Sequence, residues 1–262
     1  MLGACVDDPV VKSLLPRVKR SVMTYGFDDD ADVQAYDLVQ KGAVSHFSVR
    51  RKNHADDLKV TLAFPGRHNV LNALAAIAIA SDEGATDEDI VAGLAAFEGV
   101  GRRFEIHGTF YLENTGATGA GQFTLVDDYG HHPSEVKATI ESVREGWPDS
   151  RLVMVYQPHR YTRTLELFDQ FVEVLSQVDR LILLDVYPAG EDLIVGATGQ
   201  DLYKALARNR NLEMDFLESV DDVPAKLEEI LQADDLVLTQ GAGETSKLAR
   251  GLKEMWANRR VA

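Results

Sequence analysis

Strand-like and helix-like segments alternate through the second half of the chain. Apolar runs of strand length are separated by longer amphipathic segments of helix length, with strands at 123–126, 151–156, 180–186, 213–217 and 235–239 and helices at 134–146, 164–178, 199–208, 221–232 and 245–256. Strands joined through helices pair in parallel, and the helices cover both faces of the sheet. The pattern therefore predicts an α/β fold with a Rossmann-like, mostly parallel sheet.

The first hundred residues follow a different pattern. Apolar and polar residues alternate, as in half-buried antiparallel strands, at 21–26, 32–40, 43–51 and 58–64. Helices are predicted at 67–81, after Pro65-Gly66, and from Thr86 to about Phe97, where Asp89 completes an acidic variant of the capping box. Gly99 to Gly101 mark a hinge between the two halves. The next strands are expected at 102–107 and 110–113, before a hairpin loop at 114–121.

Composition excludes some classes of partner. The net charge is −15, and an acidic chain does not present the basic field that a nucleic-acid or anionic membrane surface requires. Cys5 is the only cysteine, so no internal disulfide can form. The longest apolar stretch, 70–80, is too short to span a bilayer, and residues 1–6 do not resemble a signal peptide. A cytoplasmic protein without membrane insertion is expected, and its oligomeric state is not indicated.

Polar residues that can bind a ligand follow the predicted strand 123–126. They are Asp127, Asp128, Tyr129, His131 and His132, and Pro133 then suits the first turn of a helix. The carboxyl ends of parallel strands are where open α/β sheets bind ligands. Carboxylate and imidazole groups suit several metals, although the spacing is not that of a zinc finger or metalloprotease. Metal binding, hydrogen bonding to a ligand such as a ribose, and structural capping remain open here.

Two further pairs of residues each allow a ligand-binding and a structural interpretation. Asn69 and Asn72 lie three apart at a helix start, so their amides share one face; they can read a purine edge or simply cap the helix. Arg160 and Arg163 lie three apart after the strand 151–156 and can grip an anion bidentately, favoured by the helix amino end, or be solvated. A glycine loop at Gly241 resembles a dinucleotide loop, but Ser246 replaces the third glycine, so a tight turn is the better interpretation.

Four strings in the chain, taken together, resemble the Mur ligase family. They are Gly66-Arg-His-Asn-Val-Leu-Asn72, Gly101-Arg-Arg-Phe-Glu105, Val126-Asp-Asp-Tyr-Gly-His-His-Pro133 and Gln157-Pro-His-Arg-Tyr-Thr-Arg-Thr164. The resemblance implies that residues 1–100 are the carboxyl-terminal part of a central ATP-binding domain, a remnant that consists of antiparallel strands plus helices. It implies residues 101–262 as a Rossmann-like amino-acid-binding domain.

The resemblance also implies a reaction and its partners. The expected activity is an ADP-forming ligase that uses ATP and Mg²⁺ to join L-alanine to UDP-N-acetylmuramate, which are small-molecule partners. The family's phosphate loop is absent from the 262 residues, and the chain opens on a strand, so we expect a fragment that is inactive alone. Magnesium ligands are expected mainly upstream, and no metal-binding residue is assigned in this chain. A non-catalytic nucleotide- or amino-acid-binding module, a sister ligase that loads a preformed murein tripeptide, and a dinucleotide-dependent oxidoreductase are the alternatives.

Individual residue roles follow from the same resemblance. For the nucleotide, the matching residues are His68, Asn69 and Asn72 around the adenine, Arg103 at a phosphate and Asp128 at the ribose. For L-alanine, the matching residues are Tyr129, His131, His159, Arg160 and Arg163, with the arginines binding its carboxylate. His131 and Arg160 are the expected catalytic residues.

Overall fold

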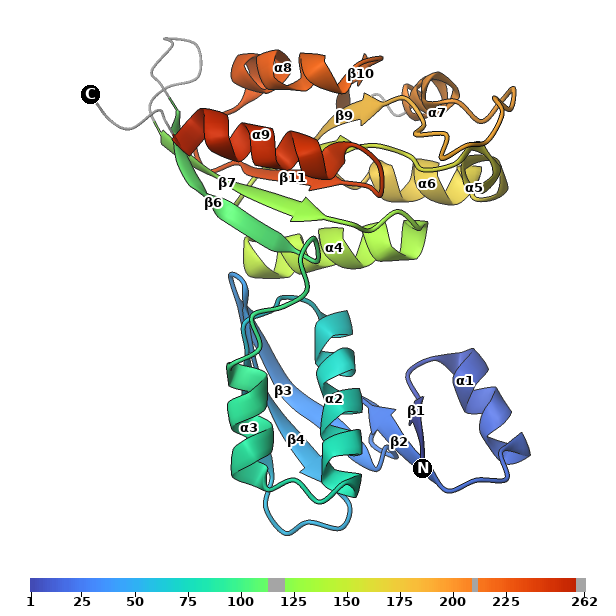
Figure 1. The fold of residues 1–262 in the computed structure, drawn as a ribbon, viewed down its shortest axis with the longest axis vertical. Coiled ribbons are helices and arrows are strands. Elements are labelled where there is room, and N and C mark those ends of the chain that lie inside the picture. The colour runs from blue at the N-terminus through green and yellow to red at the C-terminus, as the bar shows by residue number, and fades with distance from the viewer. Residues whose placement is uncertain (113–120, 209–211, 258–262) are drawn as a thin grey trace. The chain divides into compact units, whose positions relative to one another are not determined.

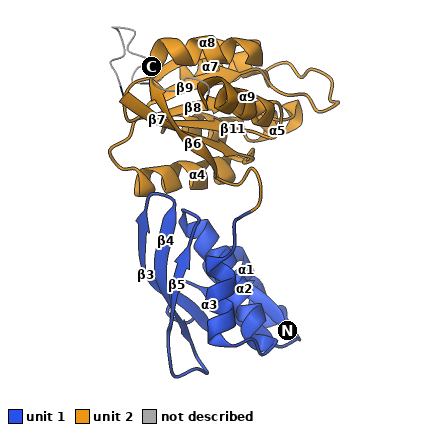
Figure 2. Cartoon of the chain, turned by 60° about the vertical axis from the view of Figure 1, so that its left-hand side comes forward, with its two compact units in different colours: residues 1–99 blue, residues 100–262 orange. Residues whose placement is uncertain are grey.

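The computed structural model describes residues 1–112, 121–208 and 212–257 of two compact units, unit 1 (Met1–Gly99) and unit 2 (Val100–Ala262; Figure 2). The division falls in the Gly99–Gly101 segment, where the sequence predicts a hinge; hinge motion stays a prediction. Within the described ranges, no helix is both long and apolar enough to cross a membrane.

Unit 1 is built on a five-stranded sheet in the order β1-β2-β3-β4-β5 (Figure 1). The strands are β1 (Leu2–Cys5), β2 (Val22–Gly26), β3 (Val33–Lys41), β4 (Val44–Arg51) and β5 (Leu58–Leu62). β3, β4 and β5 pair antiparallel, as predicted, but β2 pairs parallel with both β1 and β3. The antiparallel prediction for 21–26 is therefore wrong. Apolar alternation shows which face of a strand is buried, and it carries no information about the direction of the neighbouring strand.

Two helices bury their apolar residues against this sheet. α2 (Arg67–Asp82) and α3 (Asp87–Ala95) share one apolar core with β3, β4 and β5. Thr86 accepts a hydrogen bond from the backbone N–H of Asp89 at 3.2 Å, which is the predicted cap of α3. By contrast, α1 (Pro9–Leu14) and the 3₁₀ turn η1 (Leu15–Arg17) contain no buried residue.

The described part of unit 2 is built on a six-stranded sheet in the order β10-β9-β8-β11-β7-β6. The strands are β6 (Glu105–Leu112), β7 (Gly121–Asp128), β8 (Leu152–Tyr156), β9 (Arg180–Leu184), β10 (Glu213–Leu217) and β11 (Leu236–Gln240). Only β6 is antiparallel to its neighbour, so the predicted mostly parallel sheet is confirmed. The two strands predicted before 114 are one strand with a bulge at His107. Of the loop predicted at 114–121, residues 114–120 lie outside the described residues, and Gly121 begins β7.

Helices cover both faces of the unit 2 sheet, as Figure 1 shows. α4 (Pro133–Gly146), α6 (Phe168–Leu175) and α7 (Gly199–Leu206) pack in one core, and α8 (Val223–Ile230), after the turn η2 (Val220–Asp222), packs with α9 (Thr245–Ala257) in the other. The helix predicted at 164–178 is instead two helices, α5 (Tyr161–Glu166) and α6. They separate at Leu167, whose φ of −114° and ψ of 21° leave the helical region.

The order of the strands determines where a ligand can approach unit 2. β11 lies between β7 and β8, yet the helix after β11 covers the opposite face from the helices that follow β7 and β8. Neighbouring parallel strands whose connections leave on opposite faces create the crevice in which open α/β sheets bind ligands. A ligand site is therefore expected at the carboxyl ends of β7, β11 and β8.

Candidate functional site

Asp128 ends β7 and is almost fully buried, with 6% of its surface exposed. Its Oδ1 accepts hydrogen bonds from the backbone N–H of Gly130 at 2.7 Å and from the Gln240 amide at 2.8 Å, and its Oδ2 accepts one from the backbone N–H of Phe104 at 2.9 Å. A carboxylate oxygen has two lone-pair sites, so Oδ2 retains capacity for one more donor. Asp128 is thus mainly a structural acceptor that can still take one hydroxyl, and its predicted ribose contact stays a prediction.

Asp127 faces the other side of the sheet and holds Arg102. Its carboxylate accepts hydrogen bonds from Thr239 Oγ1 at 2.8 Å and from Arg102 Nε at 3.2 Å. Burial raises the pKa of Asp127, although Thr239 and Arg102 oppose that rise. Arg102 also donates to the carbonyl of Gly241 at 2.7 Å. Of the alternatives that the sequence leaves open, the structural one fits Asp127, because its contact with Arg102 fixes the segment before β6.

Four aromatic rings form a continuous row across the carboxyl ends of the strands. The ring centroids of Tyr129 and His131 are 5.1 Å apart, those of His131 and His159 are 5.7 Å apart, and those of His159 and Tyr187 are 5.6 Å apart. The row brings together residues that follow β7, β8 and β9. Three of the residues that the sequence predicts around L-alanine are therefore neighbours in the structure.

Two arginines contact this row, Arg103 at Tyr129 and Arg163 at His159. Arg103 lies over the Tyr129 ring at 5.4 Å and contacts Glu135 Oε1 at 3.3 Å, and 48% of its side chain is exposed. Arg163 donates to the His159 carbonyl at 3.2 Å and lies 3.4 Å from the His159 ring nitrogen Nδ1. Burial, and then the charges of His131 and the nearby arginines, lower the pKa of His159, so its imidazole is neutral at physiological pH.

Arg160 and Arg163 do not share a partner in this structure. Arg160 is exposed and lies 3.8 Å from Glu191, whereas Arg163 is turned toward His159. Glu191 also accepts hydrogen bonds from the backbone N–H of Thr162 at 3.1 Å and from its hydroxyl at 2.7 Å. The anion at the start of α5 is therefore Glu191, so the predicted contribution of that helix end to ligand binding is not available in this conformation.

The other predicted residues lie at the start of α2 in unit 1. Asn72 Nδ2 is 3.5 Å from Asn69 Oδ1, which confirms that the two amides share one face, and Asn69 also donates to the Pro65 carbonyl at 2.7 Å. Val70 on the opposite side is buried. His68 and Asn69 are half-buried and Asn72 is exposed, which suits a ligand contact or a solvated cap equally. Adenine binding by these residues stays a prediction.

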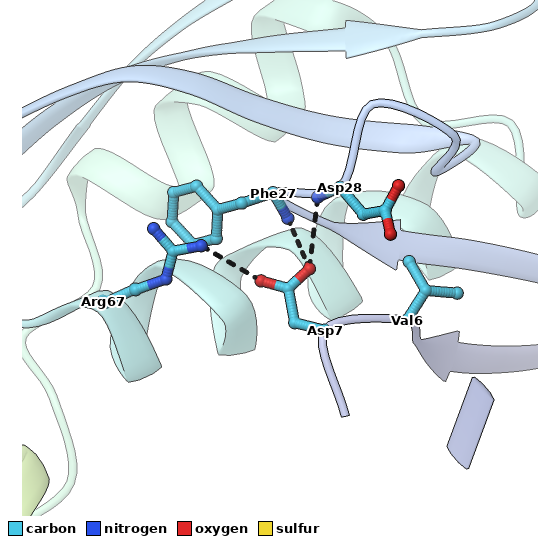
Figure 3. Close-up of a pocket in the computed structure, with 5 residues that line it drawn as sticks. All are labelled: Val6, Asp7, Phe27, Asp28 and Arg67. Carbon is cyan, nitrogen blue, oxygen red and sulfur yellow. Dashed lines mark hydrogen bonds and ion pairs between the residues drawn. The ribbon is translucent and has the colours of Figure 1, made fainter. Parts of the chain in front are cut away.

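A shallow pocket of about 480 Å³ lies beside this helix start (Figure 3). Asp7 Oδ1 accepts hydrogen bonds from the backbone N–H groups of Phe27 at 2.8 Å and Asp28 at 3.2 Å, and its Oδ2 contacts Arg67 at 3.3 Å. The Arg67 guanidinium lies 3.4 Å from the Phe27 ring centroid. The polar groups of the pocket wall therefore bond to one another, and these contacts link the start of α2 to the ends of β1 and β2.

The residues that the structure describes do not form a cluster of metal ligands. In these ranges no group of three or more His, Cys, Asp or Glu side chains converges as metal ligands would. Asp127 and Asp128 point to opposite faces of the sheet and are engaged by internal donors.

The glycine loop after β11 is a tight packing turn. A Cβ at Gly241, where φ is 148°, would lie 2.7 Å from the Gln157 carbonyl, and one at Gly243 would lie 2.3 Å from Gln157 Oε1. Gln157 also accepts a hydrogen bond from the backbone N–H of Glu244 at 2.7 Å. Close approach to Gln157 accounts for these glycines without a dinucleotide.

Three residues of the site were not anticipated in their roles. Tyr187 extends the ring row, and Glu191 occupies the start of α5; both come from the loop after β9, and no local pattern indicates such long-range contacts. Glu135 accepts hydrogen bonds from the backbone N–H groups of His131 and His132. Its position three residues after His132 is the capping-box spacing, which is the signal that could have identified it.

Comparison with known protein families identifies the chain. Residues 4–80 match the family description "Mur ligase middle domain", and residues 102–243 match "Mur ligase, glutamate ligase domain". The chain belongs to the Mur ligase family. The family resemblance of the four strings is thereby confirmed.

Solved Mur ligase structures share the fold. UDP-N-acetylmuramate–alanine ligase from Thermotoga maritima is 24% identical with a TM-score of 0.71, and the match covers 91% of this chain and 48% of that one. A murein peptide ligase from Psychrobacter arcticus is 22% identical with a TM-score of 0.62, covering 97% and 50%. MurF ligase from Thermotoga maritima in complex with ADP is 16% identical with a TM-score of 0.69, covering 99% and 54%. The chain spans about half the length of these solved ligases.

Proposed function

We propose that this chain forms part of an ATP-dependent, ADP-forming ligase that joins L-alanine to UDP-N-acetylmuramate through an acyl phosphate, in peptidoglycan precursor synthesis. The observation that carries the proposal is the row of Tyr129, His131 and His159 with Arg160 and Arg163 beside it, at the carboxyl ends of parallel strands. A row of aromatic rings with guanidinium groups beside it suits a small amino acid, because the guanidinium binds its carboxylate. Family membership and the likeness to an alanine ligase support the same reaction.

The chain's own residues bind and orient the reactants in this proposal. Arg160 leaves its 3.8 Å contact with Glu191 and, with Arg163, neutralises the alanine carboxylate. Arg103, which is half exposed, contacts a phosphate, and Asp128 Oδ2 accepts a ribose hydroxyl. In unit 1, His68 and the two asparagines of α2 face the adenine. ATP supplies the phosphoryl group that activates the muramoyl carboxylate, and positioning together with charge neutralisation lowers the barrier to amine attack.

The 262 residues contain no Gly-x-x-x-x-Gly-Lys-[Ser/Thr] string, so we expect no turnover from this chain alone. The test is ADP formation that requires both UDP-N-acetylmuramate and L-alanine, measured on this chain and on a form extended upstream through a phosphate loop. Activity in the extended form alone supports the proposal. Turnover by the short chain, or dependence on an amino acid other than alanine, contradicts it.

The second candidate is a sister ligase that loads a preformed murein peptide. The likeness to a murein peptide ligase at 22% identity, close to the 24% for the alanine ligase, supports this second candidate. Competition in the same assay separates the two: if murein tripeptide supports ADP formation and alanine does not inhibit it, the second candidate holds. Ligand binding without any turnover in the extended form indicates the non-catalytic binding module instead.

A further inference from the structure

Arg102, at the start of unit 2, contacts three separate segments of that unit. Its Nε donates a hydrogen bond to Asp127 Oδ2 at 3.2 Å, and its Nη2 donates to the Gly241 carbonyl at 2.7 Å and to the Thr245 hydroxyl at 3.3 Å. The planar guanidinium thus links the end of β7 to the loop after β11 and to the first residue of α9. Asp127 is buried and needs a charge partner, which Arg102 supplies. The charge of Arg102 is therefore committed inside the protein.

The ring of Tyr129 lies beside two guanidinium groups. The central guanidinium carbon of Arg102 is 4.9 Å from the ring centroid, and that of Arg103 is 5.4 Å from it. Two positive charges beside one ring repel each other, so each needs its own carboxylate. Asp127 compensates Arg102, and Glu135 lies 3.3 Å from Arg103. The exposed fraction of the side chain is 24% for Arg102 and 48% for Arg103, so Arg103 is the one that can reach a ligand.

The backbone on either side of Arg103 has an unusual conformation. φ is 64° at Arg102 and 47° at Phe104, in the left-handed region that residues other than glycine rarely adopt. The backbone N–H of Tyr129 donates to the Arg102 carbonyl at 2.7 Å, and the backbone N–H of Phe104 donates to Asp128 Oδ2 at 2.9 Å. Strained backbone of this kind persists where surrounding contacts hold it, and it gathers at functional sites. This turn determines the direction in which the Arg103 side chain leaves the backbone.

We propose that Arg102 is a positioning residue, which holds the Tyr129 ring and the turn at 102–104 and thereby fixes the place of the Arg103 guanidinium. The proposal rests on the proposed ligase function, in which Arg103 contacts a phosphate group. Arg102 does not touch a reactant in this arrangement, because Asp127 and Gly241 engage its guanidinium. A donor that is already in place when charge develops on a phosphoryl group stabilises the transition state without reorganisation, and Arg102 provides that preorganisation for Arg103.

Side-chain ¹⁵Nε relaxation of the arginines tests the positioning on this chain without turnover. We expect restricted picosecond-to-nanosecond motion of Arg103 Nε in the parent and increased motion in Arg102→Met. Arg144→Met is the matched control, because Arg144 also joins a carboxylate and a carbonyl, those of Asp179 at 2.8 Å and Gln177 at 3.0 Å. Unchanged Arg103 relaxation in Arg102→Met, or an equal change in the control, would overturn the proposal.

Arg102→Lys keeps the test decisive if Arg102→Met does not fold. A lysine retains a positive charge beside the buried Asp127, but it lacks the planar fork that reaches Gly241 while lying against the Tyr129 ring. We expect this variant to fold and to release Arg103 Nε as Arg102→Met does. Arg103 relaxation as restricted as in the parent would overturn the role assigned to the guanidinium.

Kinetics of the form extended upstream through a phosphate loop separate positioning from a merely structural role. Arg103→Met should lower kcat by about 100-fold, and Arg102→Met should lower it by about 10-fold. If Arg102 acts through Arg103, the double variant loses about 100-fold, rather than the about 1,000-fold of two independent effects. Arg144→Met should leave kcat unchanged. Losses that multiply in the double variant overturn the proposal. Absence of ligase activity in the parent counts against the proposed function, while the positioning is then judged by the relaxation alone.

Discussion

Replacing Asp128 by alanine should destabilise unit 2 by about 4 kcal/mol. The carboxylate ties the backbone N–H groups of Phe104 and Gly130 to the end of β7, and it also accepts a hydrogen bond from the Gln240 amide. Gln240 has a second partner in Thr139 Oγ1 at 3.0 Å, so it remains hydrogen-bonded in the variant. The two backbone donors do not have a second partner of this kind among the contacts of the described residues.

The magnitude follows from those two donors. A buried donor that loses its partner costs about 1–3 kcal/mol, so two of them cost about 2–6 kcal/mol, with a central value of about 4 kcal/mol. Asp128→Asn keeps one acceptor oxygen and places an N–H₂ group where the second one was. It should therefore lose about half as much stability as the alanine variant.

Intrinsic tryptophan fluorescence during urea unfolding measures this change in unit 2. Both tryptophans of the chain, Trp147 and Trp256, lie in this unit, and Trp147 stacks on Phe104 with ring centroids 5.7 Å apart. Asp149→Ala, at an exposed turn after α4, is the matched control and should change stability by less than about 0.5 kcal/mol. A loss from Asp128→Ala that equals the control would refute the structural role assigned to this carboxylate.

Three other substitutions test separate parts of the structure. Burial lowers the pKa of His107, so the unfolded chain takes up a proton below about pH 6.5 that the folded unit does not. The free energy of unfolding therefore decreases as the pH decreases. His107→Gln should weaken this pH dependence between pH 7.5 and 5, as measured by urea unfolding. An unchanged slope would contradict this. Arg51 is 3% exposed and pairs with Asp87, which is 41% exposed, so Asp87→Asn should cost about 2 kcal/mol rather than the larger cost of breaking a fully buried pair. The Arg51 hydrogen bond also holds the pKa of Asp87 below its usual value. The pair therefore stabilises unit 1 above about pH 4, and this stabilisation is lost as the pH falls further. Hydrogen exchange of the α3 amides measures both effects, and equal protection in variant and parent would count against them. Gly243→Ala brings a Cβ to 2.3 Å from Gln157 Oε1 and should lower stability by about 1–3 kcal/mol in thermal unfolding, whereas an unchanged midpoint would show that the loop relaxes freely.

Secondary structure and fold class could be predicted because they depend on local patterns. Apolar runs separated by amphipathic segments indicated the parallel sheet of unit 2, and its strands and helices lie close to the predicted positions. The break at Leu167 was not visible, because the apolar spacing of α5 and α6 is continuous across it. The direction of β2 was predicted wrongly because strand pairing is a non-local property.

The candidate site shows the same division between residue type and residue role. The sequence places two adjacent arginines, Arg102 and Arg103, before β6, and nothing in their type distinguishes them. The Asp127 carboxylate and the Gly241 carbonyl engage the first, whereas the side chain of the second is half exposed. These partners belong to β7 and to the loop after β11, which are distant from the arginines along the chain. A sequence identifies which side chains are available at a site, and the folded backbone around them determines which of them can meet a ligand.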